Sequence, residues 1–323
     1  MPAQHPHNNL FEKVMELPQA AKALIEHFFP QKILSELDLS TLRQAPDSFI
    51  TEDLAPYFSD VIYACQWKGK PTYLSLLFEH KSYYELPDLQ FMTYVVQGYQ
   101  KQKRKWQTEL KAAKKAKRDY LKYVPVPILP VLLYHGTEAW QDKTFKDLFD
   151  LPTAAFEPYI PSIDYLLIDL NQQADSQLEA VQMKLLLAML LLFKHKGDKE
   201  YVLKNFAKFF IFVEQTVDTI TQNYIKVFVL YIYQTFRLDK TDLNRVMLNL
   251  PINVKNEFMT TYDYLIDKGK IEGKIEGKIE GKIEGKIEGK IEGEIKTKLN
   301  VFLDLWINLP DASDDLLMTI AKF

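Results

Sequence analysis

One apolar segment of the chain ends in residues that could perform metal-dependent chemistry. Residues 73–81 begin as an apolar run typical of a buried strand and finish with Glu79, His80 and Lys81. Side chains alternate between the two faces of a strand, so Glu79 and Lys81 are predicted to share one face and His80 to lie on the other. A carboxylate and an ammonium at the rim of a buried strand are costly to desolvate unless they pair, bind a metal or meet a ligand.

A second carboxylate precedes this segment. Asp60 lies in residues 57–64, which also read as a strand, and the turn-forming residues 68–71 separate the two segments. If the segments pair as an antiparallel hairpin, Asp60 and Glu79 can meet at its open end.

Two carboxylates in this position suit Mg²⁺, which prefers oxygen ligands and keeps several waters. The backbone carbonyl of His80 is well placed as a further ligand. Such a metal lowers the pKa of a bound water and neutralises charge on a phosphodiester. Lys81 would orient or deprotonate the attacking water and stabilise the developing charge. The simpler alternative is a Glu79–Lys81 ion pair at a strand end, because Glu-x-Lys arises by chance in many proteins.

Several short motifs strengthen the first interpretation. Over about half of the chain, their order and spacing resemble the recombination-promoting nuclease / putative transposase family, a branch of the PD-(D/E)XK nuclease superfamily. The motifs are His7–Phe11, Leu37–Leu42, Asp47–Ile50, Tyr57–Tyr63, Leu76–Ser82 and Pro130–Gly136.

The resemblance implies a metal-dependent DNA endonuclease that promotes recombination, with Asp60 and Glu79 on Mg²⁺ (or Mn²⁺) and Lys81 catalytic. The implied fold class is α/β (α+β): a restriction-endonuclease-like αβββαβ core with a C-terminal all-helical extension. Two departures matter. The family often opens with His-Asp where this chain has His7 and Asn8, so no catalytic role is assigned there. Many members carry Glu-x-Gln, whereas Glu79-His80-Lys81 is the commoner form in the superfamily and favours activity.

The distribution of charge indicates a nucleic-acid partner. The formal net charge is only −3, yet residues 101–122 carry ten Lys or Arg against Glu109 and Asp119. A basic helix with interleaved aromatic residues can track a phosphate backbone, although a solvated surface helix has the same composition. The candidate DNA contacts here are Lys101, Lys103, Arg104 and Lys105.

Gln90 and Tyr94 are further candidates. They lie four residues apart on one face of the helix expected to start near Asp88. They resemble a Gln-x-x-x-Tyr element that follows Glu-x-Lys in some superfamily members, where it touches DNA or the site lysine. Ordinary packing of Tyr94 is the alternative.

Composition and pattern predict two or more domains in the 323 residues. The nuclease-like domain is expected over 1–170, a helical domain over 171–266, a Lys-Ile-Glu-Gly repeat as linker or helix over 267–296, and a helical tail over 297–323. Other expected elements are a helix over 8–29, a loop or short first strand over 46–53, a helix through 101–122, strands over 128–134 and 165–170, and helices over 178–193, 201–213, 217–236 and 243–250.

The remaining features concern the cellular location of the protein. The single Cys65 excludes an internal disulfide, which is consistent with a reducing cytoplasm. The longest apolar run, Leu185–Phe193, is about half the length of a membrane span, so we expect a cytoplasmic protein that does not bind a membrane. A further expectation is a homo-oligomer formed through the helical C-terminal half. The function class that competes with a nuclease is a catalytically inactive DNA-binding or protein-interaction module on the same fold. Transposition itself ranks below both, because the three-carboxylate arrangement of transposases is not evident.

Overall fold

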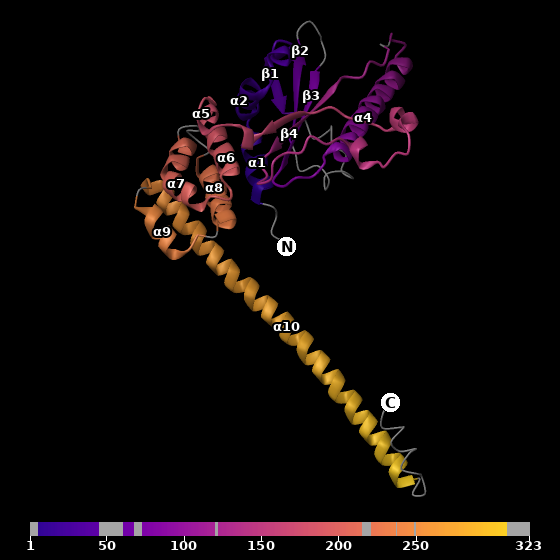
Figure 1. The fold of residues 1–323 in the computed structure, drawn as a ribbon, viewed down its shortest axis with the longest axis vertical. Helices are drawn as coiled ribbons and strands as arrows, with labels where there is room; N and C mark the ends of the chain where they lie inside the picture. Colours follow the sequence, from indigo (N-terminus) through magenta and orange to yellow (C-terminus); the bar gives the residue numbers. More distant parts are fainter. Residues whose placement is uncertain are drawn as a thin grey trace. The chain divides into compact units, whose positions relative to one another are not determined.

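The structure is a computed structural model that describes residues 6–44, 61–67, 73–119, 122–214, 221–236, 238–248 and 250–308. The chain divides into two compact units, Met1–Phe258 and Met259–Phe323. The first unit contains a sheet and the helices packed on it (Figure 1). The second consists largely of the long helix α10.

The sheet has five strands in the order β1-β2-β3-β4-β5. Neighbours β1–β2 and β2–β3 are antiparallel, whereas β3–β4 and β4–β5 are parallel. The antiparallel pairing expected of the second and third strands and the mixed α+β class are therefore confirmed. The strands are β1 Leu37–Gln44, β2 Ile62–Trp67, β3 Tyr73–Lys81, β4 Ile128–Tyr134 and β5 Leu166–Asp169.

Four of the described α-helices precede or separate the strands in the sequence, and the remaining ones follow the last strand. The helices are α1 Pro6–Met15, α2 Pro18–Phe28, α3 Gln31–Leu34, α4 Asp88–Lys115, α5 Asp175–Leu178, α6 Lys184–Lys194, α7 Lys199–Glu214, α8 Thr221–Phe236, α9 Lys240–Met247 and α10 Ile252–Asn308. Short 3₁₀ helices are η3 Phe145–Leu148, η4 Ala154–Tyr159 and η5 Leu170–Gln172. Helix α4 joins β3 to its parallel neighbour β4, which is the crossover that a parallel pair requires.

The two faces of the sheet pack against different helices (Figure 1). On one face, Phe91 and Tyr94 of α4 pack with Leu132 of β4. On the other, Tyr63 of β2 donates a hydrogen bond of 2.7 Å to the backbone oxygen of Met15 in α1. Helix α6 is buried on all sides from Leu185 to Phe193, which its uniformly apolar sequence predicts. The sheet and helices α5–α9 thus share one compact unit.

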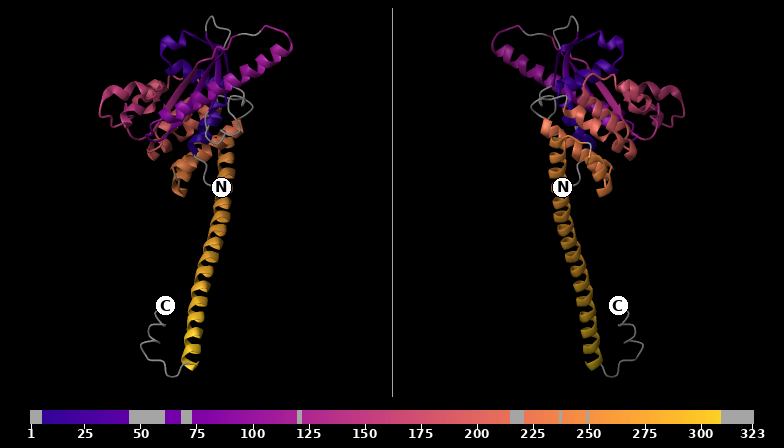
Figure 2. Two further views of the ribbon diagram at one scale, coloured as in Figure 1. Left: turned by 90° about the vertical axis from the view of Figure 1, so that its right-hand side faces the viewer. Right: turned by 90° about the vertical axis from the view of Figure 1, so that its left-hand side faces the viewer.

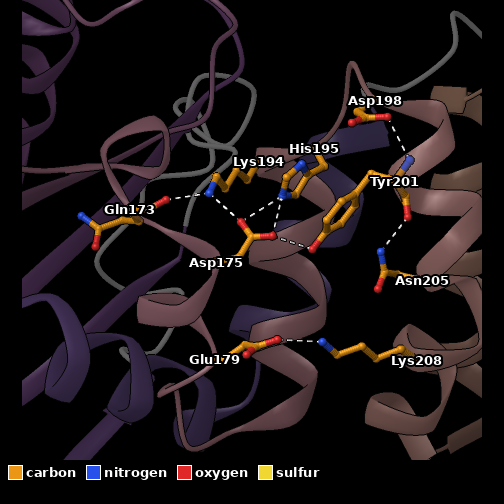
Figure 3. Close-up of polar contacts among 9 residues, drawn as sticks. All are labelled: Gln173, Asp175, Glu179, Lys194, His195, Asp198, Tyr201, Asn205 and Lys208. Atoms are coloured by element: carbon orange, nitrogen blue, oxygen red, sulfur yellow. Dashed lines mark hydrogen bonds and ion pairs between the residues drawn. The ribbon is translucent and has the colours of Figure 1, made fainter.

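A polar cluster around Asp175 connects three consecutive helices, α5, α6 and α7 (Figure 3). Its carboxylate lies 2.6 Å from Lys194 Nζ and 3.0 Å from His195 Nε2, and it accepts a 2.8 Å hydrogen bond from the Tyr201 hydroxyl. The rings of His195 and Tyr201 stack with centroids 3.5 Å apart. Burial alone raises the pKa of Asp175, but the hydrogen bonds from Lys194, Tyr201 and His195 outweigh it and lower the pKa to about 2. The cluster therefore joins α5, the end of α6 and the start of α7.

Replacing Asp175 by asparagine is expected to lower the free energy of unfolding by about 1–3 kcal/mol at neutral pH, because charge-assisted hydrogen bonds are lost. A carboxyl group whose pKa is depressed in the folded state stabilises the fold above its unfolded pKa. That contribution disappears as pH falls from 3.8 towards 2, so the difference between variant and wild type should narrow there. Urea unfolding at several pH values measures it.

Asp198→Asn is the matched control. Asp198 accepts a 2.9 Å hydrogen bond from the backbone amide of Tyr201. Asparagine is as good as aspartate at the start of a helix, so this change should have little effect. Equal losses in the two variants, or a loss in Asp175→Asn that does not vary with pH, would contradict the role given to the Asp175 carboxylate.

Helix α10 contains the Lys-Ile-Glu-Gly repeat, which the sequence left open as linker or helix. At Gly281, Gly285, Gly289 and Gly293 an added Cβ would meet no atom within 4 Å outside the local helix backbone. Each glycine costs a helix nearly 1 kcal/mol relative to alanine. Changing these four to alanine should raise the helical circular dichroism signal and the melting temperature of α10.

The control for this prediction is Gly197→Ala. Gly197 has equally open surroundings but lies in the turn between α6 and α7, so alanine adds no helix there. A fall in helicity in the four-alanine variant would show that these positions need glycine.

Among the described helices, none offers a segment that is both long and apolar enough to span a lipid bilayer.

Candidate active site

The residues Glu79, His80 and Lys81 end the central strand of the sheet. Their backbones are in parallel register with Leu132, Leu133 and Tyr134 of β4. The pairing continues one step further, because the amide of His135 donates a 2.9 Å hydrogen bond to the carbonyl of Lys81. Asp60 and the side chain of Glu79 lie outside the described part of the chain.

Lys81 is largely withdrawn from solvent. Its side chain is 12% exposed, and its Nζ lies 2.8 Å from Oε2 of the half-exposed Glu85. Glu85 lies in the connection that leads from β3 into α4. The sequence did not single out Glu85, because a carboxylate four residues beyond a strand lysine has no regular spacing rule. An ammonium held in a mostly dry position can act on a phosphate with little screening by water.

His80 lies on the opposite face, as strand alternation predicts. It is 7% exposed and its ring packs against Phe11 of α1 and Phe193 of α6. Its Nδ1 is 3.2 Å from Nε2 of His135. The imidazole therefore belongs to the core behind the strand, and only its backbone remains available to the rim.

His135 directly follows β4. It is 1% exposed, and its ring stacks on Phe193 with centroids 4.2 Å apart. Burial, followed by the influence of His80, His7 and Lys196, lowers the pKa of His135 well below its usual value. The ring of His7 lies 5.0 Å from that of His135, and His7 Nδ1 is 3.1 Å from the Tyr231 hydroxyl. His135 is thus neutral within a layer of buried rings.

Gln90 and Tyr94 share one face of α4, as predicted. Gln90 Nε2 donates a 2.5 Å hydrogen bond to the Tyr94 hydroxyl. Tyr94 is 5% exposed and packs with Phe91 and Leu132. Since Leu132 is in register with Glu79, α4 covers the sheet at the level of the candidate site. A role for this pair in contacting DNA remains a prediction.

The C-terminal half of α4 has one packed side and one charged side. The packed side is the row Gln102, Trp106, Leu110 and Ala113, which is less exposed than its neighbours. Gln102 exchanges hydrogen bonds of 2.7 and 2.9 Å with the backbone of Val126. The ring of Trp106 lies 5.4 Å from that of Tyr123. The segment after α4 therefore folds back along the uncharged side of the helix.

The charged side faces solvent. Lys103, Arg104 and Lys105 are exposed, whereas Lys101 is half-buried, and its burial lowers its pKa. The basic end of α4 extends past the sheet in Figure 2. This surface can contact an extended polyanion.

The basic helix ends earlier than expected, at Lys115. Lys117 adopts a left-handed backbone with φ of 51°. The amides of Lys117 and Arg118 then bond to the carbonyls of Lys114 and Ala113, respectively. This is the hydrogen-bond pattern of a helix-terminating Schellman motif. The basic surface is consequently divided between the helix and the segment that follows it.

Within the described residues, three or more His, Cys, Asp or Glu side chains are nowhere grouped so as to hold a metal ion. The predicted ligands Asp60 and Glu79 are outside that set of side chains. The third predicted ligand is the carbonyl of His80. Successive carbonyls point to opposite sides of a strand. The Lys81 carbonyl points to β4, and the His80 carbonyl therefore points to the β2 side.

Comparison with known proteins gives consistent names. The chain is 27% identical over 201 residues to the inactive recombination-promoting nuclease-like protein RpnE of Escherichia coli K12, covering 61% of this chain and 60% of that protein. It is 26% identical over 245 residues to the recombination-promoting nuclease RpnC, covering 74% and 72% of the two chains. It is also 27% identical over 176 residues to the recombination-promoting nuclease RpnA, covering 54% of each chain. RpnC and RpnA come from the same strain of Escherichia coli as RpnE.

The chain thus spans less than two thirds of the length of RpnE and RpnA. No solved structure matches it. The family described as "Putative transposase, YhgA-like" matches residues 5–221, which include the whole sheet and helices α1–α7. The chain therefore belongs to the YhgA-like putative transposase family, and it is similar to proteins named recombination-promoting nucleases.

Proposed function

We propose that the protein is a Mg²⁺-dependent endodeoxyribonuclease that promotes DNA recombination, built on a PD-(D/E)XK core. The observation that carries this proposal is the place of Glu79-His80-Lys81 at the carboxyl end of the central strand. Three antiparallel strands, helix α4 and the parallel strand β4 follow one another in the order that the resemblance implies for that core, which supports the proposal. Two relatives are named recombination-promoting nucleases.

Asp60, Glu79 and the His80 carbonyl are the proposed metal ligands. The β2–β3 register pairs Ile62 with Leu77. In the sequence, Asp60 precedes Ile62 by two residues and Glu79 follows Leu77 by two residues. The His80 carbonyl points towards the β2 side of β3. The donor set consists of oxygens, which suits Mg²⁺ and also Mn²⁺. When bound, such an ion lowers the pKa of a coordinated water and offsets charge on the phosphate.

Lys81 is the proposed catalytic cation. Its ammonium would donate hydrogen bonds to the scissile phosphate and the attacking water. Glu85 holds the side chain in place before DNA arrives. The low exposure of Lys81 supports this role, because preorganised charge in a dry site stabilises a transition state more than charge in water.

The exposed basic side of α4 is the proposed DNA-binding surface. Lys103, Arg104 and Lys105 would contact phosphates, with Lys101 closer to the protein core. Phosphate contacts fix the position of the duplex without reading its sequence. Gln90 and Tyr94 would lie between this surface and the metal site, as supporting groups.

A catalytically inactive module is the second candidate. RpnE and the relative YjiP are both named as inactive proteins, and the latter is 27% identical over 77 residues. Such a module would bind DNA or protein partners on the same fold without cutting.

Supercoiled plasmid incubated with the full chain separates the two candidates. A nuclease converts it to nicked or linear DNA with Mg²⁺ and leaves it intact with EDTA. Retarded but uncut plasmid under both conditions would favour the inactive module.

A further inference from the structure

We propose that Lys196 is a positioning residue of the nuclease site, because it holds the end of β3 in place from the helical half of the protein. The inference rests on the proposed function. It gives helix α6 and the turn after it a part in catalysis that neither the family description nor the names of the relatives assign.

The contact crosses a long stretch of sequence. Lys196 lies in the turn after α6, and its Nζ donates a hydrogen bond to the backbone oxygen of Ser82. Ser82 directly follows Lys81. Lys196 is about half-buried, and its burial lowers its pKa. A lysine withdrawn from water costs free energy, so its place here needs a compensating contact, and the Ser82 carbonyl supplies one.

Two further contacts hold the neighbouring residues. Nε2 of His135 lies 3.2 Å from Nδ1 of His80, and the amide of His135 donates a 2.9 Å hydrogen bond to the Lys81 carbonyl. Three consecutive residues at the end of β3, His80, Lys81 and Ser82, are therefore each held by a contact from another part of the chain. The helical half also supports His135 itself, since Phe193 of α6 stacks on its ring.

Catalytic groups must be held to within about 0.5 Å of their working positions. Lysine has a long flexible side chain, so the position of Lys81 depends on how firmly its backbone is held. A displacement of about 1 Å can cost about a hundredfold in rate. Removing the Lys196 contact should therefore affect the chemical step rather than DNA affinity.

Lys196→Met tests this, because methionine keeps an unbranched apolar side chain and loses the donor. We expect kcat for DNA cleavage to fall by about 10- to 100-fold with KM for DNA unchanged. Lys196→Arg, which retains a donor, should recover part of the rate. Lys199→Met is the control: Lys199 pairs with Asp242 in the same helical half, away from β3, and its loss should leave kcat unchanged.

Hydrogen–deuterium exchange of the peptide over 78–85 gives a readout that does not depend on activity. It should be faster in Lys196→Met and unchanged in Lys199→Met. A cutting wild type with unaltered kcat and exchange in Lys196→Met would overturn the inference. So would losses of kcat in both variants that merely follow their thermal stability. If the wild-type protein does not cut DNA but exchange is faster in Lys196→Met, the proposed nuclease function is refuted, whereas the role of Lys196 in holding the end of β3 is supported.

Discussion

Replacing Lys81 by methionine should lower the rate of Mg²⁺-dependent DNA cleavage by about 10²–10³-fold, the usual cost of removing one preorganised group that stabilises transition-state charge. DNA affinity should change little, because most of the phosphate contacts are assigned to α4. Single-turnover cleavage and binding by fluorescence anisotropy measure the two effects separately. Thermal stability should not fall, since the Lys81–Glu85 pair has one half-exposed partner and such pairs contribute little.

Lys22→Met is a matched control for Lys81→Met. Lys22 pairs with Glu26 at the same spacing, on α2, with both side chains about half-exposed. This variant should cut DNA at the wild-type rate. Full activity in Lys81→Met would refute the assignment of the catalytic cation.

Changing Lys103, Arg104 and Lys105 together to glutamine should weaken DNA binding on the order of tenfold or more at moderate salt. If each contacts one phosphate, the slope of log affinity against log salt should become shallower by about 2.7. The reduction should be similar for unrelated duplex sequences, because these contacts do not read bases. Anisotropy titrations across a salt series measure both quantities.

The control for this prediction changes Lys282, Lys286 and Lys290 to glutamine. These residues are exposed on α10, and the repeat balances each lysine with a glutamate. The net charge changes by the same amount, so the control separates a local contact from a general effect of charge. An equal loss of affinity in both triple variants would contradict a binding surface on α4.

Regular segments with strong local patterns were predictable from the sequence. The strand expected over 128–134 is β4, and the final strand expected over 165–170 is β5. The alternation that separated His80 from Lys81 is confirmed by their different surroundings. These features depend on short-range periodicity, which a single sequence contains.

Local breaks in the helices were harder to predict. The helix expected over 8–29 is divided into α1 and α2, because Pro18 lacks an amide hydrogen and starts a new helix. The helix expected through 101–122 stops at Lys115, where a lysine takes the left-handed position usually given to glycine. The first described strand is Leu37–Gln44, which was not expected; residues 46–53, expected as a loop or a short first strand, lie outside the described part of the chain.

The supporting residues of the candidate site could not be found from spacing. Lys196 is 114 residues from Ser82, and Tyr231 is 224 residues from His7. Only the packing of α1, α6 and α8 brings these groups behind β3. The sequence therefore predicts the strand that carries the candidate site, whereas the tertiary structure determines which residues hold that strand in place.

The rate of plasmid cleavage as a function of Mg²⁺ concentration, measured for the wild type, Asp60→Asn and Glu79→Gln in parallel, tests the nuclease assignment most directly. The account predicts saturable, EDTA-sensitive cleavage by the wild type and losses of about 10²-fold or more in both variants. Cleavage by either variant at the wild-type rate and Mg²⁺ dependence, or the absence of cleavage by the wild type at every concentration, would contradict it.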